Sequence, residues 1–265
     1  SNIVTGEILE ALTAVKTAVS ANYSAGDRIT YALSLVNTGT AAVTDYTVTD
    51  NLGGYTVGAN TVYPLAYNAG TVRYYINGVL QTAPTVTAGP PLTVTGLTVP
   101  AGGSAVLIYE TTATPVAPLA TGSSITNTAT ITGGGLTTPI TAQATVETAN
   151  SAELSISKAL SPTTVTENGQ ITYTFVISNT GNTEATATGN VVVTDTFAPI
   201  LRNIAVTYNG TAWTEGTNYT YNAATGVFTT LAGQITVPAA SFTQNTDGTF
   251  TVTPGTAALV ITGTV

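Results

Sequence analysis

The chain lacks three side chains on which much of protein chemistry depends. Its 265 residues include no cysteine, no histidine and no methionine. Without cysteine there is no disulfide, no thiolate nucleophile and no zinc–thiolate site. The absence of histidine removes the commonest acid–base group and metal ligand of proteins. Any covalent stabilisation of this chain must therefore use other side chains.

Charge is also scarce. Only 7% of the residues are charged, and five Lys or Arg against 13 Asp or Glu give a net charge of −8. A nucleic-acid partner is excluded because phosphate binding depends on basic side chains. A basic membrane-binding patch is excluded for the same reason, and no apolar run approaches the length of a membrane span. Low charge with abundant Thr, Asn and Gly is typical of exported prokaryotic surface proteins, so we expect an extracellular, cell-surface location.

The chain is rich in residues that favour β-strands and tight turns. Short segments rich in Val, Thr and Tyr alternate between polar and apolar residues, which favours half-buried strands. Turn signals separate them, as at Asn77-Gly78, Asn209-Gly210 and Asp247-Gly248. This pattern predicts an all-β fold of two tandem immunoglobulin-like antiparallel β-sandwiches.

An internal repeat supplies the domain boundaries. The chain has only two lysines, Lys16 and Lys158, and each precedes an Ile-Thr-Tyr motif. The spacing from lysine to tyrosine is 31 − 16 = 15 residues in one copy and 173 − 158 = 15 in the other. We expect a first sandwich over 11–149, a second over 150–265, and a separate N-terminal strand over 1–10.

The two copies differ at their ends. Segment 105–112 of the first copy aligns with 258–265 of the second. The first copy then continues through two more predicted strands, 124–132 and 140–147, for which the second copy has no counterpart. We therefore expect the second sandwich to lack its closing strand or strands and to present an unpaired edge.

The N-terminal segment offers a strand that could fill this edge. Residues 7–19 can be read as a short helix or as parts of two strands, 2–8 and 12–18, and the alignment of Lys16 with Lys158 favours strands. The pattern Asn2-x-Val4-x-Gly6-x-Ile8 resembles Asn127-x-Ala129-x-Ile131 in the closing strand of copy one. We expect the N-terminal strand of one subunit to complete the second sandwich of the next by strand addition.

Alternation places both lysines on apolar faces. Lys158 shares a face with Leu154, Ile156 and Leu160, and Lys16 shares one, more weakly, with Leu12. Both are expected to be buried. A buried, unpaired ammonium is costly, so each lysine should lose its proton or find a partner.

Candidate partners share those faces. Asp50 and Asp195 lie in matching Val-Thr-Asp settings, and Asn127 also points inward. A lysine, an aspartate and an asparagine on core faces can form an isopeptide bond. Desolvation lowers the pKa of the lysine and raises that of the aspartate, so a neutral amine attacks the Asn carboxamide. The protonated aspartate polarises the carbonyl and shuttles protons, and ammonia leaves.

These residues carry a resemblance. A strand lysine is followed by Gly-x-x-Ile-Thr-Tyr at 26–31 and by Asn-Thr-Gly at 37–39 and 179–181. Val-Thr-Asp comes next, and then Ile-Thr-Asn-Thr-Ala at 125–129. This series resembles the Thr-rich immunoglobulin-like repeats of prokaryotic surface proteins, a repeat family without an assigned function. The placement of Lys, Asp and Asn also resembles the isopeptide-forming domains of Gram-positive pilins and adhesins.

The second resemblance implies roles for particular residues. Lys16 and Asn127 would be joined within the subunit, with Asp50 as proton shuttle. Lys158 and Asp195 match in copy two, but the Ile-Thr-Asn-Thr-Ala strand is absent there. Asn2 of a neighbouring subunit is then the candidate partner of Lys158, through an intermolecular bond.

Simpler readings of the same residues stay open. Each lysine could form only a salt bridge with its aspartate, and Asn127 only a cross-strand hydrogen bond. Asn37 and Asn179 are rival amide partners, each 21 residues beyond its lysine (37 − 16 and 179 − 158). Asn-Thr-Gly is, however, a turn signal at a strand end.

The expected function is structural. The chain is predicted to be a subunit of an extracellular fibre or pilus, a head-to-tail homopolymer of identical subunits. The alternative is a spacer or binding repeat of a cell-surface adhesin or S-layer protein, monomeric as isolated. We expect no enzyme activity beyond autocatalytic bond formation, no cofactor and no metal.

Overall fold

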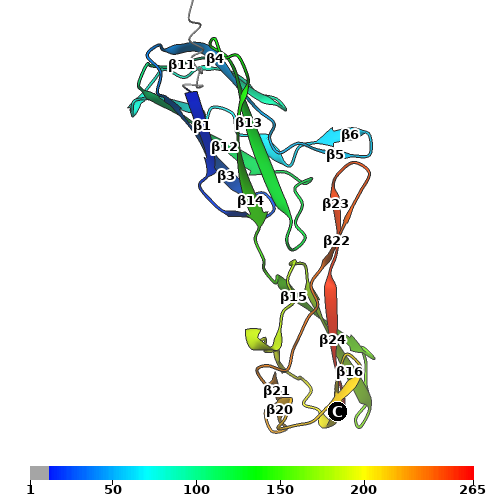
Figure 1. The fold of residues 1–265 in the computed structure, drawn as a ribbon. Helices are drawn as coiled ribbons and strands as arrows, with labels where there is room; N and C mark the ends of the chain where they lie inside the picture. The colour runs from blue at the N-terminus through cyan, green and yellow to red at the C-terminus, as the bar shows by residue number, and fades with distance from the viewer. Residues whose placement is uncertain (1–11) are drawn as a thin grey trace, which may run out of the picture. The chain divides into compact units, whose positions relative to one another are not determined.

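The computed structural model describes residues 12–265 (Figure 1). The predicted donor strand over 1–10, with Asn2, lies outside the described residues. The described part is built from β-strands, with a single 3-10 turn at Ala187–Gly189. The prediction of an all-β, immunoglobulin-like sandwich fold is confirmed.

The chain divides into two compact units. Unit 1 consists of the described residues up to Ala149 together with Gln244–Phe250, and unit 2 consists of Asn150–Thr243 and Thr251–Val265. Each has its own buried apolar cluster.

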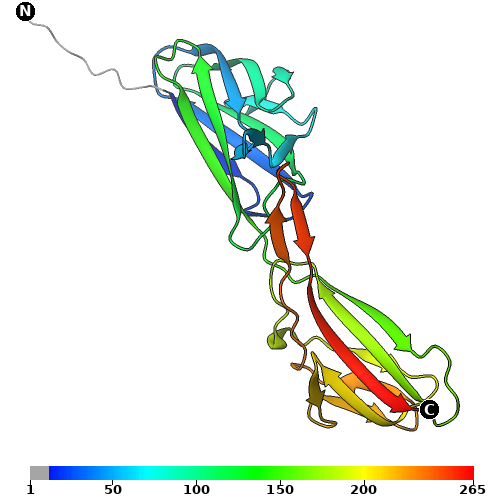
Figure 2. The same ribbon diagram turned by 90° about the vertical axis from the view of Figure 1, so that its right-hand side faces the viewer.

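Unit 1 contains two main sheets (Figure 2). The first has the order β1 (Leu12–Ala18), β3 (Arg28–Asn37), β12 (Ser104–Ala113), β8 (Arg73–Ile76) and β9 (Val79–Leu80), with β7 (Leu65–Tyr67) also on β12. The second has the order β10 (Thr85–Thr87), β11 (Leu92–Val99), β4 (Val43–Asp50), β13 (Ser124–Gly133), β14 (Ile140–Thr148) and β2 (Asn22–Tyr23). A small hairpin joins β5 (Tyr55–Val57) to β6 (Asn60–Val62). Strand β14 also lies against β1, so the two sheets meet along this side.

The core of unit 1 follows from strand alternation. Every second residue of β3 from Ile29 to Asn37 is buried, and β12 and β13 show the same period of two. The predicted strand over 12–18 is β1, so the helical reading of this segment is wrong.

Unit 2 has the same plan with fewer strands. Its larger sheet has the order β15 (Leu154–Ser161), β16 (Gln170–Asn179), β24 (Gly255–Thr264), β18 (Arg202–Tyr208) and β19 (Thr211–Trp213). Its second sheet has the order β17 (Thr194–Thr196), β21 (Val227–Thr230) and β20 (Tyr219–Asn222). A hairpin is formed by β22 (Ser241–Gln244) and β23 (Phe250–Thr253), and its Gln244–Phe250 end is grouped with unit 1.

The strand registers show what unit 2 lacks. Asp50 of β4 faces Leu92 of β11 on one side and Ala129 of β13 on the other. Asp195 of β17 faces Phe228 of β21, and among residues 150–265 no strand pairs with the other side of β17. Residues 150–265 therefore supply no counterpart of β13 or β14, and the prediction that they lack the closing strands is confirmed.

One repeat alignment needs correction by a residue. Ala105 lies opposite Leu35, and Ala257, rather than Ala258, lies opposite the equivalent Ile177. Two consecutive alanines permit either alignment from sequence alone, but only Ala257 faces the core. With this alignment, Ile261 is the equivalent of Tyr109.

The expected burial of the second lysine strand is wrong. Every residue of β15 is exposed, including Lys158, although Leu154, Ile156 and Leu160 are apolar. The face of β15 that carries Lys158 does point toward the second sheet, where Asp195 lies. However, residues 150–265 supply no counterpart of β13 or β14 to cover it. Burial of this face requires strands that residues 150–265 do not supply.

Candidate functional site: two lysine–aspartate pairs

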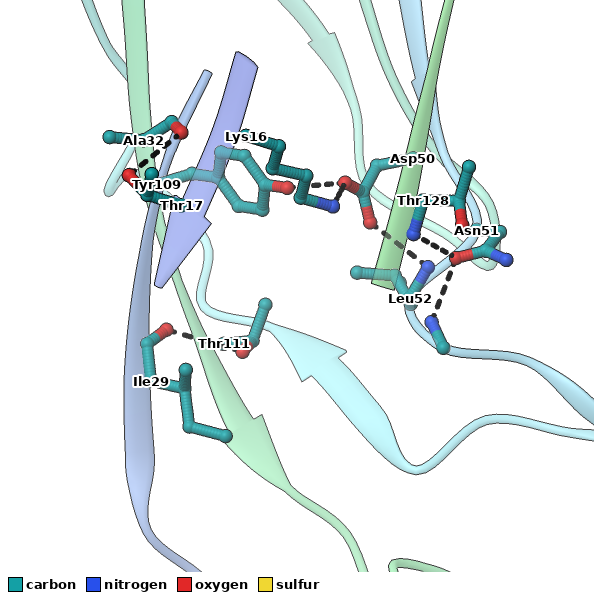
Figure 3. Close-up of polar contacts among 11 residues, drawn as sticks. Lys16, Thr17, Ile29, Ala32, Asp50, Asn51, Leu52, Tyr109, Thr111 and Thr128 are labelled. Atoms are coloured by element: carbon teal, nitrogen blue, oxygen red, sulfur yellow. Dashed lines mark hydrogen bonds and ion pairs between the residues drawn. The ribbon is translucent and has the colours of Figure 1, made fainter. Parts of the chain in front are cut away.

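In unit 1, Lys16 and Asp50 form a buried ion pair between the two sheets. The Nζ atom of Lys16 on β1 lies 2.5 Å from Oδ2 of Asp50 at the end of β4, and their side chains are 0% and 1% exposed (Figure 3). The two strands belong to different sheets. The fold therefore joins residues 34 positions apart in sequence.

The carboxylate of Asp50 is fully engaged. The Tyr109 hydroxyl donates a hydrogen bond to Oδ2, and the backbone N–H of Leu52 donates one to Oδ1 at 2.9 Å (Figure 3). With Lys16, this gives Asp50 three donors. Such charge-assisted hydrogen bonds compensate for the removal of the carboxylate from water.

Two tyrosine rings surround the ammonium group. The Nζ atom of Lys16 lies 4.9 Å from the ring centroid of Tyr31 and 5.8 Å from that of Tyr109. The two rings stack on each other with centroids 5.8 Å apart. Aromatic faces attract a cation and at the same time exclude water from it.

This environment shifts proton affinities in the predicted direction for the lysine. Burial lowers the pKa of Lys16 from 10.5 to about 8, although the nearby Asp50 charge opposes the change. Burial also raises the pKa of the Tyr109 hydroxyl, and the negative charge of Asp50 adds to the effect. Lys16 is thus easier to deprotonate than a free lysine, whereas Tyr109 stays a hydrogen-bond donor.

Asn127 is the third member of the predicted set in unit 1. Asp50 pairs with Ala129, so Asn127 lies two residues further along the same face of β13. It is fully buried, and neither its Oδ1 nor its Nδ2 has a hydrogen-bond partner. The side chain of Asn51 ties β13 to the end of β4, because its Oδ1 accepts hydrogen bonds from the backbone N–H groups of Thr128 and Gly53 (Figure 3).

Unit 2 repeats the pair in an open setting. Lys158 Nζ lies 2.5 Å from Asp195 Oδ2, with side chains 37% and 19% exposed. The ammonium group lies 4.6 Å from the ring centroid of Tyr173 and 5.6 Å from that of Phe197. Tyr173 and Ile261 occupy the places of Tyr31 and Tyr109, so the aspartate of this pair has no tyrosine donor equivalent to Tyr109.

The rival amides have other partners. Asn37 Nδ2 donates to the carbonyl oxygen of Ala41 at 2.8 Å, and its Oδ1 accepts from Gly39 N–H. Asn179 makes the matching bonds to Thr183 and Gly181. Asn37 also pairs with Leu12, four residues along β1 from Lys16. Both asparagines therefore hold the turn that follows their strand, as the turn reading predicts.

Sequence reasoning missed the two tyrosines that complete the unit 1 site. Tyr31 could have been found from the sequence, because it ends the Ile-Thr-Tyr motif that is repeated in both copies. Tyr109 carried no such signal, since its role depends on the register of β12 against β3. Within residues 12–265, no cluster of acidic side chains has the makings of a metal site. The same residues form no helix long and apolar enough to cross a membrane.

Comparison with known proteins gives structural neighbours only. No protein-family model and no curated protein matches the chain. The major pilin subunit of Bacillus cereus is similar over 93% of this chain and 66% of its own, with 14% identity and a TM-score of 0.37. The pilus backbone protein of Streptococcus pneumoniae is similar over 92% and 55%, with 13% identity and a TM-score of 0.38. A C-terminal fragment of a major pilin of Streptococcus agalactiae is similar over 59% and 66%, with 12% identity and a TM-score of 0.38.

These neighbours are surface proteins of Gram-positive bacteria, and the chain spans less than two thirds of the length of each of the three. Identities and TM-scores this low support no conclusion about the function of this chain.

Proposed function

We propose that the chain is a structural subunit of an extracellular fibre or pilus. Subunits join head to tail when the N-terminal strand of one completes unit 2 of the next. One Lys–Asn isopeptide bond locks unit 1, and a second joins neighbouring subunits. The observation that carries this proposal is the uncovered Lys158–Asp195 pair, beside which residues 150–265 supply no counterpart of β13 or β14.

The intramolecular bond follows from the set in unit 1. The neutral Nζ of Lys16 attacks Cγ of Asn127, and a C–N bond forms while the bond from Cγ to Nδ2 breaks. Asp50 takes a proton from Nζ and delivers it to the departing nitrogen, which leaves as ammonia. Burial favours the neutral amine, and the fold holds the reacting groups in place.

The intermolecular bond uses the same chemistry with a borrowed asparagine. An incoming strand that pairs with β17 as β13 pairs with β4 would bring Asn2 of the neighbour to the position of Asn127. The same strand would cover the apolar face of β15. A head-to-tail contact of this kind does not close on itself, so repetition gives a filament.

The test compares the wild type with three single-residue variants and asks which of them form multimers that survive boiling in detergent. The wild type should give a ladder of covalent multimers. Lys158→Ala and Asn2→Ala should give only monomers, while Lys16→Ala should keep the ladder because its unit 2 is intact. The intact mass of the Lys158→Ala monomer should be lower than calculated by one ammonia, from the bond in unit 1.

A ladder in Lys158→Ala would contradict the proposed linkage. A wild type that stays monomeric would favour the alternative, a spacer or binding repeat of a surface adhesin. An unchanged intact mass in Lys158→Ala would remove the intramolecular bond.

A further inference from the structure

Buried polar atoms without partners gather around the Lys16–Asp50 pair. In residues 12–265, four buried side-chain polar atoms make no hydrogen bond, and three of them are Tyr31 Oη, Asn127 Oδ1 and Asn127 Nδ2. Folded proteins rarely leave such atoms unpaired, and each exception calls for an explanation such as a catalytic role.

Tyr31 is a neighbour of the side chains proposed to react. Its ring faces Lys16 Nζ at 4.9 Å, and the residue is fully buried. Burial and the nearby Asp50 charge raise the pKa of Tyr31. Asn127 lies on the same face of β13 as Ala129, which pairs with Asp50, so Asn127 and Tyr31 both border the Lys16–Asp50 pair. Asp50 already has three donors in Lys16, Tyr109 and Leu52. The unpaired group that remains for Tyr31 is the Asn127 amide.

We propose that the Tyr31 hydroxyl donates a hydrogen bond to the carbonyl oxygen of Asn127 while Lys16 attacks, which makes Tyr31 a catalytic residue of the cross-linking reaction. This inference rests on the proposed isopeptide bond in unit 1 and adds a member to its site.

The need for such a donor follows from the electron flow. When Nζ of Lys16 adds to Cγ of Asn127, the electron pair of the C=O double bond moves to Oδ1, which becomes negatively charged. Tyr31 stabilises this charge at a buried site, where a fixed donor is most effective. Asp50 passes the proton from Nζ to Nδ2, the C=O bond re-forms as the bond from Cγ to Nδ2 breaks, and Nδ2 leaves as ammonia.

A comparison of the two units supports this division of roles. Tyr109, which binds Asp50, is replaced by Ile261 in unit 2, but the position of Tyr31 holds Tyr173. The ring of Tyr173 faces Lys158 as that of Tyr31 faces Lys16. The tyrosine whose hydroxyl is unpaired in unit 1 is thus kept in unit 2, and the tyrosine whose hydroxyl binds the aspartate is lost.

The test is Tyr31→Phe, which keeps the ring beside Lys16 and removes only the hydroxyl. The loss of ammonia is monitored by intact-mass spectrometry after a pulse of protein synthesis. We expect Tyr31→Phe to react about 100-fold more slowly than the wild type, which is typical for loss of one oxyanion donor. The melting temperature of the unreacted chain, compared in a Lys16→Ala background, should not fall, because the lost hydroxyl has no partner there.

Tyr46→Phe is the matched control. Tyr46 is a buried tyrosine of β4, and its hydroxyl is hydrogen bonded to that of Tyr74. This variant should have a lower melting temperature but react at the wild-type rate. The inference is overturned if Tyr31→Phe reacts as fast as the wild type, or if its slower reaction comes with the same fall in melting temperature as in Tyr46→Phe. A wild type that keeps its ammonia overturns the proposed bond itself, a result separate from either of these.

Discussion

At the scale of the residue, two ion pairs of equal length differ in their surroundings. Lys16 is buried beside two tyrosine rings, whereas more than a third of the Lys158 side chain is exposed. Desolvation is what makes a lysine amine nucleophilic at neutral pH. In the proposed chemistry, the first pair is desolvated by its own unit, and the second needs a covering strand.

The pKa of Lys16 predicts a pH profile for cross-linking in unit 1. Below a pKa of about 8 the ammonium form predominates, so the reaction rate should rise about tenfold per pH unit and then level off above that value. Tyr31 and Tyr109 stay protonated in this range because burial raises the pKa of each above 10.0. The measurement is the rate of ammonia loss in pulse-labelled Lys158→Ala chains.

A rate independent of pH between about 6 and 8 would show that deprotonation of Lys16 does not limit the reaction. The Tyr46→Phe variant serves as control here too and should follow the wild-type profile.

At the scale of the element, unit 2 differs from unit 1 by the strands that cover its lysine. Strand β14 lies against β1, and Leu12 of β1 is buried. In β15 no residue is buried. An exposed apolar strand beside an unpaired edge invites pairing with another chain.

A peptide experiment isolates this element. A peptide of residues 1–10, added in excess to the Asn2→Ala chain, should attach covalently at Lys158 with loss of one ammonia. The same peptide with Asn2→Ala should give no covalent product, because the strand would lack the reacting amide. Mass spectrometry of proteolytic fragments locates the bond.

Attachment at Lys16, or attachment of both peptides, would contradict the proposal that the donated strand brings Asn2 to Lys158. The Lys158→Ala version of the chain should bind neither peptide covalently.

Sequence periodicity predicted the strands well and their environments less well. Alternation placed Lys16 and Lys158 on inward faces, and repeat matching found Asp50 and Asp195. Alternation reports which way a side chain points but not whether anything lies over it, so the exposure of β15 was missed. Tyr109 was missed because hydrogen bonding to Asp50 depends on which strands of opposite sheets meet, a property of the tertiary fold.

At the scale of the whole molecule, a chain without cysteine is expected to use another covalent staple. A bond between Lys16 and Asn127 closes a loop of 127 − 16 = 111 residues. By the chain-entropy argument used for disulfides, closing a loop of this size stabilises a fold by about 4–5 kcal/mol.

The corresponding prediction concerns Asn127→Ala, made in the Lys158→Ala background so that only monomers are compared. Unit 1 should lose roughly 4–5 kcal/mol of unfolding free energy, measured by urea denaturation. Little further loss is expected from the side chain itself, because neither amide atom is hydrogen bonded before reaction.

Equal stability of the two chains would show that no bond forms at this site. Lys158→Ala alone is the control and should unfold, in unit 1, like the wild type.

The positions of Lys16 on β1 and Asn127 on β13 have a mechanical consequence. In the proposed fibre, a pulling force enters a subunit at Asn2 and leaves at Lys158. The covalent route between them runs from residue 2 to 16, across the side-chain bond to 127, and on to 158. Strands β2 to β12, and everything after Lys158, lie off this route. Tension would therefore pass through the subunit without drawing on the hydrogen bonds of most of its sheets, and a stretched fibre would keep its folded sandwiches.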